Sequence, residues 1–319
     1  MIGILGAGAF GTALAIALGQ EGRDIRLWAR DPAQARAMQA TRQNLAHLPK
    51  ATLPDSVTVL SDLVALGPCD ILLLAMPMQS LGPFLQQHAS TLPPAPAIAC
   101  CKGVDLLTLQ GATAVIRIYL PNRDCGVLTG PSFAADIAAG LPTALTLATD
   151  SPQGDTLQRQ LSTATLRLYL TTDITGAELG GALKNVMAIA AGIVVGAGLG
   201  DSARAALMTR GYAEMQRFAL ALGARADTLT GLSGLGDLIL TCTSLQSRNL
   251  RYGICLGSGA AFDPTVTVEG VATAQAVAKI ARLKAIDMPV TQMVASLIDR
   301  TIPLDQAVRS LMSRPLKQE

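Results

Sequence analysis

The chain is sparing in charged and aromatic side chains. Of its 319 residues, 15% are charged and 3% are aromatic, and the formal net charge is +2. A balance so close to neutrality does not indicate a nucleic-acid or anionic-membrane surface, so any anion must be bound by a few placed basic groups. Half of the residues are hydrophobic. This composition and length suffice for two ordinary domains with large cores.

Metal-ligating and targeting patterns are scarce as well. The cysteines form no C-x-x-C pair and the sequence has two histidines, so we expect no metal site. Such cysteine usage fits a reduced protein, and we expect a cytoplasmic location. The first residues read as a strand without a basic region or cleavage site, which predicts no signal peptide. The apolar run Val186–Gly200 is shorter than the ~18 residues of a membrane span, so we expect no integral membrane protein.

A glycine-rich turn lies between a strand and a helix at the N-terminus. The apolar run Ile2–Leu5 is followed by Gly6-Ala-Gly-Ala-Phe-Gly11 and by the helical pattern Thr12–Gln20. In this G-x-G-x-x-G context, Gly6 permits the tight turn, Gly8 lets a pyrophosphate approach the backbone, and Gly11 lets the helix pack on the strand. The free N–H groups and the dipole of the helix favour an anion there. The pattern predicts a dinucleotide-binding unit.

The end of the second predicted strand, Asp24–Ala29, bears on the choice of cofactor. NAD-selective sites usually place an acidic residue there, whereas this chain has Arg30 followed by Asp31. Arg30 could pair with a 2′-phosphate, which favours NADPH, with NAD as the other possibility. Asp31 reads as the N-cap of a helix that begins with Pro32.

Strand and helix patterns alternate up to about residue 174. Further apolar runs predict strands over Val57–Leu60, Cys69–Ala75, Ala97–Cys101, Gly126–Thr129, Thr143–Ala148 and Leu166–Leu170. Such runs predict a Rossmann-like, doubly wound, mostly parallel sheet covered by helices on both faces. Ligands bind beyond the carboxyl ends of such strands, where Pro77, Lys102 and Gly130-Pro-Ser132 stand.

Helical patterns dominate the remainder of the chain. They cover Gly176–Gly192, Ala203–Leu222, Leu245–Leu256, Val271–Leu283, Met288–Ile298 and Pro303–Ser313. We therefore expect a dinucleotide-binding α/β domain over residues 1–174 and an all-α substrate and catalytic domain over residues 175–319. Within the latter, Lys184 stands at the start of the apolar run Val186–Gly200. Burial disfavours a charged ammonium, so Lys184 is either a candidate acid/base or a structural lysine whose head reaches water.

The order of several motifs resembles the bacterial NAD(P)-dependent glycerol-3-phosphate dehydrogenase family. Besides the glycine-rich turn, the matching segments are Cys101-Lys-Gly103, Gly130-Pro-Ser-Phe-Ala134, Glu178-Leu-Gly-Gly-Ala-Leu-Lys-Asn185, Gly234-Leu-Gly-Asp-Leu238, Thr241-Cys-Thr-Ser244, Ser247-Arg-Asn249 and Val268-Glu-Gly270. Together they span nearly the whole chain. The resemblance implies reversible hydride transfer between a nicotinamide cofactor and C2 of dihydroxyacetone phosphate, giving sn-glycerol 3-phosphate for phospholipid synthesis.

The resemblance also implies site residues. Lys184 would be the general acid/base, with Asp237 orienting groups in the same catalytic site. The substrate would be held by Lys102, Gly130, Ser132, Lys184, Asp237, Ser247, Arg248 and Asn249. The cofactor would be lined by Gly6, Gly8, Ala9, Phe10, Gly11, Arg30, Lys102, Ala134, Arg248, Thr267 and Glu269. We expect the protein to act as a homodimer, with no nucleic-acid partner.

One loop and three single positions depart from the family pattern. The loop Asn44–Pro49 stands where N-x-R-Y-L-P is usual, so a positive charge is missing near the predicted cofactor cleft. Phe10 replaces Trp or Tyr, Asp136 stands near a frequent Glu, and Thr267 replaces an aliphatic residue. His47 lies in the departing loop, whereas His88 follows a polar helix pattern and is expected at the surface.

The chemistry constrains Lys184 further. Reduction needs a proton donor at the developing alkoxide, and the reverse reaction needs a base near neutral pH. The apolar run, Lys102 and Arg248 would lower the pKa of Lys184, and Asp237 would raise it. Ser247 reads as a helix N-cap that offers N–H groups to a phosphate. The segment Gly231–Gly236 lacks a following GK[ST], so it is expected to shape the turn before Asp237.

Two other interpretations remain open at this point. The chain could be a related two-domain dehydrogenase that acts on a β-hydroxy acid, since such enzymes share the lysine and asparagine on a central helix. It could also be a nucleotide-sensing module without catalysis. Cys101-Lys-Gly103 and Ser247-Arg-Asn249 favour a phosphorylated substrate over a carboxylate, and a sensing module would have no need of Lys184 and Asp237 together.

Overall fold

The computed structural model describes residues 1–307, and its first half is built on one eight-stranded sheet. The strand order is β10-β9-β8-β7-β6-β1-β2-β5, and each neighbouring pair is parallel except β8 and β9. The bounds are β1 Ile2–Leu5, β2 Ile25–Trp28, β5 Val57–Leu60, β6 Ile71–Leu74, β7 Ala97–Ala99, β8 Cys125–Thr129, β9 Thr143–Thr149 and β10 Leu166–Thr171. The mostly parallel sheet is confirmed.

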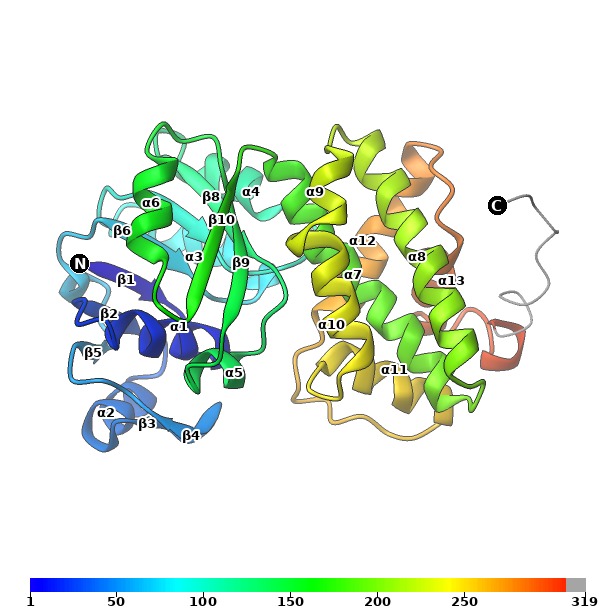
Figure 1. Ribbon diagram of the computed structural model, residues 1–319, viewed down its shortest axis with the longest axis horizontal. Coiled ribbons are helices and arrows are strands. Elements are labelled where there is room, and N and C mark those ends of the chain that lie inside the picture. The colour runs from blue at the N-terminus through cyan, green and yellow to red at the C-terminus, as the bar shows by residue number, and fades with distance from the viewer. Residues whose placement is uncertain (308–319) are drawn as a thin grey trace.

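Helices cover both faces of this sheet, as the continuous apolar strands predict (Figure 1). On one face, a buried cluster joins the sheet to α1 (Ala9–Gly19), α2 (Pro32–Thr41), α5 (Ala134–Ala138) and α6 (Gly154–Leu161). The other face packs against α3 (Met78–His88), α4 (Ala112–Tyr119) and the short 3₁₀ turn η1 (Val64–Leu66). Cys100 belongs to the first cluster and Cys101 to the second, so adjacent side chains enter opposite layers.

The second half of the chain is helical and forms its own core (Figure 1). Its helices are α7 Ile174–Gly196, α8 Asp201–Ala221, α9 Ala226–Thr230, α10 Asp237–Thr243, α11 Arg248–Ser258, α12 Glu269–Leu283 and α13 Pro289–Ile298. Helices α9 and α10 are additions to the predicted pattern, because each is too short to show a clear period. Most of the helix predicted over Pro303–Ser313 lies outside the described residues.

Helix α7 is the axis of this core. It begins at the N-cap Asp173, whose carboxylate accepts a hydrogen bond from the backbone N–H of Gly176, and most of its residues are buried. The length of the apolar run Val186–Gly200 underestimates the length of this helix. Helix α7 has 23 residues, and its length and composition alone would allow it to cross a membrane. In this structure, 89% of its most apolar 18-residue segment is buried inside the protein. The helix therefore serves here as a core element.

Two small elements were not predicted from the sequence. The loop that departs from the family pattern forms a hairpin of β3 (Gln43–Asn44) and β4 (Leu48–Thr52), beside α2 at one edge of the α/β half (Figure 1). The segment before Asp237 is the π-helical turn η2 (Leu232–Gly236), which leads directly into α10. Such turns are rare, so the local composition gave no reason to expect one. They often occur at functional sites.

Candidate active site

The glycine-rich turn has the geometry that its motif predicts. Gly6 adopts φ +119°, and a Cβ there would lie 2.6 Å from the carbonyl oxygen of Ala75. A Cβ on Gly11 would lie 2.0 Å from the carbonyl oxygen of Gly6, so helix α1 sits directly on the turn. A Cβ on Gly8 would meet no protein atom within 4 Å. The open space before the first turn of α1 is the kind of cradle that a pyrophosphate fits.

Other predicted cofactor residues surround this turn. Ala9 begins α1, and Phe10 and Ala134 are both half-buried and pack against the same apolar cluster. Arg30 is exposed just beyond β2. Asp31 is confirmed as the N-cap of α2, because its Oδ1 accepts a hydrogen bond of 2.8 Å from the backbone N–H of Ala33. With Asp31 engaged in this cap, Arg30 remains the charged side chain at the strand end.

The hairpin β3–β4 is attached to the glycine-rich turn. The side-chain Nδ2 of Asn44 donates to the carbonyl of Ala7 (2.9 Å) and to the hydroxyl of Thr12 (2.8 Å), and Asn44 is buried. His47 lies exposed at the hairpin tip. His88 is half-buried with its ring centroid 4.9 Å from that of Phe84, so it is less exposed to solvent than the sequence indicated. The ring of Phe84, on the same helix, packs against it.

Lys184 lies in a buried network with an acid, a hydroxyl and a second lysine. Its Nζ is 2.9 Å from Oδ1 of Asp237 and donates to Oγ1 of Thr241 at 2.7 Å. The other oxygen of Asp237 accepts a hydrogen bond from Nζ of Lys102. The four side chains come from α7, α10 and the segment after β7, so the network bridges the two halves of the chain. Thr241 was missed as a site residue, although the sequence places it one helical turn after Asp237.

Burial decides the charge balance of this network. The side chains of Lys184 and Asp237 are 9% and 1% exposed. The pKa of Lys184 is lowered to about 8, because burial and the charge of Lys102 lower it more than the charge of Asp237 raises it. Burial raises the pKa of Asp237, but the two lysines outweigh that effect and hold it below its usual value. The predicted contribution of Arg248 to Lys184 is not part of this balance.

Predicted substrate residues gather at the ends of β7 and β8. Lys102 Nζ donates to the carbonyl of Gly130 at 2.9 Å, and Gly130 adopts φ +139° at the end of β8. The hydroxyl of Ser132 donates back to the same carbonyl at 3.3 Å. These contacts bring Lys102, Gly130 and Ser132 together with Asp237, as ligand binding beyond strand ends requires.

The segment Ser247–Asn249 begins α11 in the helical half. Ser247 is confirmed as its N-cap, since its Oγ accepts from the backbone N–H of Leu250 at 3.1 Å. Arg248 is exposed, whereas Asn249 is buried. The side chain of Asn249 bonds to Asn185 and to the backbone of Gly270, so its amide is engaged within the protein.

Glu269 links α12 to helix α3 of the α/β half. It is the first residue of α12, and its carboxylate interacts with the backbone N–H of Met78, which begins α3 after β6. Burial raises the pKa of Glu269 to about 7, opposed by the charge of Arg248 and by the Met78 hydrogen bond. Thr267 is exposed just before α12. Arg248 therefore acts on a carboxylate at the domain junction.

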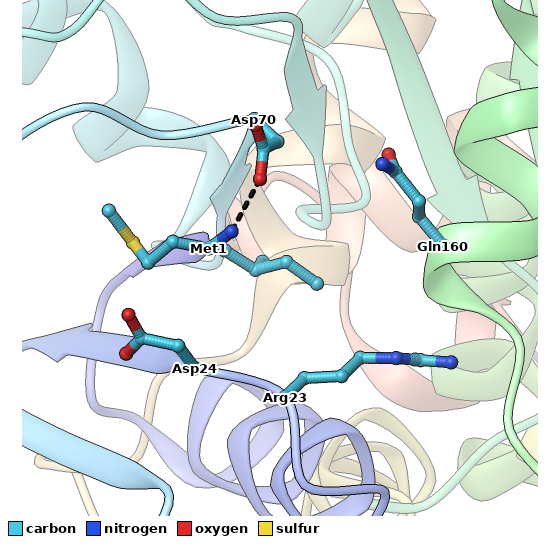
Figure 2. A pocket seen from close by; sticks show the side chains of 6 residues that line it. Met1, Arg23, Asp24, Asp70 and Gln160 are labelled. Carbon is cyan, nitrogen blue, oxygen red and sulfur yellow. Dashed lines mark hydrogen bonds and ion pairs between the residues drawn. The ribbon is translucent and has the colours of Figure 1, made fainter.

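A hollow elsewhere on the surface is separate from this network. This cavity has a volume of about 280 Å³. In it the N-terminal ammonium pairs with Asp70 (Figure 2). Met1, Asp24 and Asp70 precede β1, β2 and β6, so the cavity lies at the amino ends of the parallel strands. Its lining is Met1, Ile2, Arg23, Asp24, Asp70 and Gln160. Ligands of open α/β sheets bind at the opposite edge. Within residues 1–307, no group of three or more His, Cys, Asp or Glu residues could hold a metal ion.

Known proteins match the chain from end to end. The family model for the N-terminus of NAD-dependent glycerol-3-phosphate dehydrogenase matches residues 1–155, and that for its C-terminus matches residues 173–309. A relative from Cereibacter sphaeroides, named glycerol-3-phosphate dehydrogenase, NAD(P)+, is 61% identical and aligns over 100% of both chains. One of the same name from Ruegeria sp. is 56% identical, over 100% of this chain and 99% of its own.

Solved structures agree with these matches. Glycerol-3-phosphate dehydrogenase from Coxiella burnetii has a TM-score of 0.93 and 36% identity, and the match covers 98% of each chain. A ketopantoate reductase from Ralstonia eutropha has a TM-score of 0.64 and 15% identity, over 97% of this chain and 100% of its own, and shares the fold alone. The chain therefore belongs to the NAD-dependent glycerol-3-phosphate dehydrogenase family.

Proposed function

We propose that this NAD(P)-dependent glycerol-3-phosphate dehydrogenase interconverts dihydroxyacetone phosphate and sn-glycerol 3-phosphate through acid/base catalysis by Lys184. Family membership over the whole chain supports the activity. The observation that carries the role of Lys184 is its buried contact with Asp237 and Thr241, in the network that Lys102 joins from the sheet. A titratable group of this kind, shifted by burial and by named charges, is a candidate for proton transfer.

In the direction of reduction, the ammonium of Lys184 would polarise the C2 carbonyl and give its proton to the developing alkoxide. In the direction of oxidation, the neutral amine would accept the proton of the C2 hydroxyl. A pKa of about 8 lets both forms be populated near neutral pH, which suits a reversible reaction. Asp237 would hold the lysine in place, and its charge keeps the pKa from falling further.

The phosphate of the substrate requires basic groups and N–H donors. Lys102 lies in the network itself, and Arg248 stands exposed at the start of α11, where the positive end of the helix dipole would favour an anion. Gly130 and Ser132 would line the substrate on the sheet side. Ser247 would act mainly by capping α11.

The cofactor would lie along the glycine-rich turn. The open space at Gly8 fits its pyrophosphate, with Gly6, Ala9, Phe10 and Gly11 forming the turn. When bound, the nicotinamide supplies or accepts the hydride. Arg30, exposed at the end of β2, would pair with the 2′-phosphate and favour NADPH. Ala134, Lys102, Arg248, Thr267 and Glu269 would complete the lining.

The wider setting of the enzyme follows from this proposal. Residues 1–174 would bind the cofactor, and residues 175–319 would supply Lys184 and most of the substrate site. The enzyme would act in the cytoplasm as a homodimer and provide glycerol 3-phosphate for phospholipid synthesis. Sedimentation tests the homodimer, and cell fractionation tests the cytoplasmic location. The supply of glycerol 3-phosphate is tested with a strain that lacks the enzyme, which should grow when glycerol 3-phosphate is added.

One assay tests the activity directly. The absorbance of NADPH is followed with dihydroxyacetone phosphate, with dihydroxyacetone and with a β-keto acid as separate substrates. Rapid oxidation is expected with the phosphorylated ketone and little with the others. Oxidation with the β-keto acid instead would favour the β-hydroxy acid dehydrogenase interpretation, and cofactor binding without any oxidation would favour a sensing module.

A further inference from the structure

One buried amide ties the hairpin β3–β4 to both sides of the glycine-rich turn. The Nδ2 of Asn44 donates to the carbonyl oxygen of Ala7 at 2.9 Å and to Oγ1 of Thr12 at 2.8 Å. Ala7 precedes helix α1 and Thr12 lies in its first turn, so the two hydrogen bonds span the turn at Gly8. The side chains of Asn44 and Thr12 are both buried. The two bonds are therefore formed away from water, where hydrogen bonds are stronger.

The hydrogen bond to Ala7 also fixes the direction of the next N–H group. The carbonyl of Ala7 and the N–H of Gly8 belong to one planar, trans peptide unit, in which the two groups point in opposite directions. Because Asn44 holds the carbonyl on the side of the hairpin, the N–H of Gly8 points away from the hairpin. Within residues 1–307 this N–H has no hydrogen-bond partner, and a Cβ on Gly8 would meet no protein atom within 4 Å. A free N–H beside open space at the start of a helix suits a phosphate oxygen.

The hairpin is itself anchored to the main sheet, so Asn44 acts from a fixed base. Arg42, just before β3, adopts φ +58°, and its Nη2 donates to the carbonyl of Val57 at 2.9 Å. The backbone N–H of Leu53 donates to the carbonyl of Arg42 at 2.7 Å. These bonds close the base of the hairpin and attach it to the beginning of β5.

The other end of the Asn44 amide argues against a purely structural role. Its Oδ1 is buried and has no hydrogen-bond partner in the part of the chain that the structure describes. A buried acceptor without a partner destabilises a fold, and an apolar side chain of similar volume would avoid that cost. The amide is therefore better explained by the two groups that its Nδ2 holds than by its effect on stability.

We propose that Asn44 is a positioning residue that aims the N–H of Gly8 at the pyrophosphate of the bound cofactor. This inference rests on the proposed function, because the cofactor is taken to lie along the glycine-rich turn. A donor that is already in place lowers the cost of binding. The pyrophosphate is common to NADH and NADPH, so loss of the amide should weaken both cofactors by a similar factor. The KM for dihydroxyacetone phosphate at saturating NADPH should stay unchanged, because the amide bonds to the turn and not to the Lys184 network.

The experiment measures the dissociation constants of NADPH and NADH by fluorescence without substrate, and then kcat and KM at saturating NADPH. Asn44→Leu removes both hydrogen bonds at similar volume, and Asn44→Ala replaces it if the leucine variant does not fold. Gln43→Ala, at the preceding residue of the same strand, is the matched control. The melting temperature of each unliganded variant is recorded, because a merely structural role would lower it without changing the dissociation constants.

Asn44→Leu should raise the dissociation constants of NADPH and NADH each about tenfold, the effect of one lost hydrogen bond of a buried group. Gln43→Ala should stay close to wild type. Thr12→Val leaves the bond to Ala7 intact, so it should weaken the cofactors less than Asn44→Leu does. The double variant Thr12→Val/Asn44→Leu should bind no more weakly than Asn44→Leu alone, because a single amide makes both bonds.

Gly8→Ala, which fills the space proposed for the pyrophosphate, separates this inference from the proposed function. If Gly8→Ala weakens NADPH and Asn44→Leu does not, the cofactor lies at the turn and the role of Asn44 is rejected. If neither variant weakens NADPH, the placement of the cofactor is wrong and the inference falls with it. A wild type that binds NADPH without turnover would reject the proposed function, and Asn44 would still be judged by the dissociation constants.

Two further results would overturn the role of Asn44. One is a loss of affinity in Asn44→Leu for NADPH alone, which would assign the effect to the 2′-phosphate. The other is a raised KM for dihydroxyacetone phosphate with unchanged dissociation constants for both cofactors, which would place the effect at the substrate.

Discussion

The Nζ of Lys184 and Oδ1 of Asp237 are 2.9 Å apart in the protein interior, yet the pKa of Lys184 is lowered to about 8. An isolated ion pair would raise the pKa of the lysine. Burial prevails here, and the second lysine, Lys102, shares the carboxylate on its other oxygen. Asp237, placed between two lysines, thus holds Lys184 in place while Lys184 can still lose its proton near neutral pH.

Replacing Lys184 by methionine should abolish turnover while the cofactor still binds. The methionine retains an apolar stem in the core of α7 but has no proton to give. We expect kcat to fall by ~10²–10⁴, the usual contribution of a positioned acid/base group. Steady-state rates and NADPH fluorescence titration measure the two properties. Turnover near the wild-type level would reject the role of Lys184.

The two directions of the reaction should respond oppositely to pH. Reduction needs the ammonium of Lys184, so its kcat should fall as pH rises through about 8, whereas oxidation needs the amine and should gain over the same range. Asp237→Asn removes a charge that raises the pKa of Lys184, so the descending limb for reduction should move to lower pH. A limb that stays in place, or moves upward, would show that another group is being titrated.

Thr241 should assist Lys184 through its hydroxyl. Its Oγ1 accepts from Nζ of Lys184 at 2.7 Å and donates to Oδ1 of Asp237 at 3.1 Å. Thr241→Val has the same shape without the hydroxyl, and we expect kcat to fall roughly tenfold because a hydrogen bond to a charged group is lost. Thr241→Ser should recover most of the activity. A valine variant with wild-type kcat would show that the hydroxyl is not needed.

Arg30 should discriminate between the two nicotinamide cofactors. Its exposed guanidinium at the end of β2 can bind two oxygens of a 2′-phosphate, a group that NADH lacks. Arg30→Gln should therefore weaken NADPH by about tenfold or more, the range of charge-assisted hydrogen bonds, and NADH far less. Dissociation constants for both cofactors provide the measurement. Equal losses would mean that Arg30 contacts the adenosine portion common to both.

The sequence was most informative where one repeating pattern determines the structure. The apolar strands and the glycine-rich turn predicted the sheet, because buried parallel strands need continuous apolar residues. The caps at Asp31 and Ser247 were also readable, since the hydrogen bond of an N-cap spans a few residues. The same local logic placed Lys184 at the start of a buried apolar run.

Features that depend on contacts between distant helices could not be read in this way. Nothing near Asn249 in the sequence indicates that its amide meets Asn185 and Gly270, which are 64 and 21 residues away. The missed role of Thr241 has a different reason. The spacing Asp237–Thr241 puts both on one face of α10, but that helix was itself not predicted, because its 7 residues are too few to show a clear period.

Alanine substitutions in the glycine-rich turn should separate cofactor binding from folding. At Gly8 a Cβ meets no protein atom within 4 Å, so Gly8→Ala should fold with a melting temperature near wild type. The added methyl group would occupy the space proposed for the pyrophosphate, and NADPH should bind at least tenfold more weakly, because backbone N–H contacts to the phosphates are lost. Gly11→Ala places its Cβ 2.0 Å from the carbonyl of Gly6, so it should lower the melting temperature of the unliganded protein. Thermal unfolding and NADPH titration of both variants test this contrast. Unchanged NADPH affinity in Gly8→Ala would place the cofactor elsewhere.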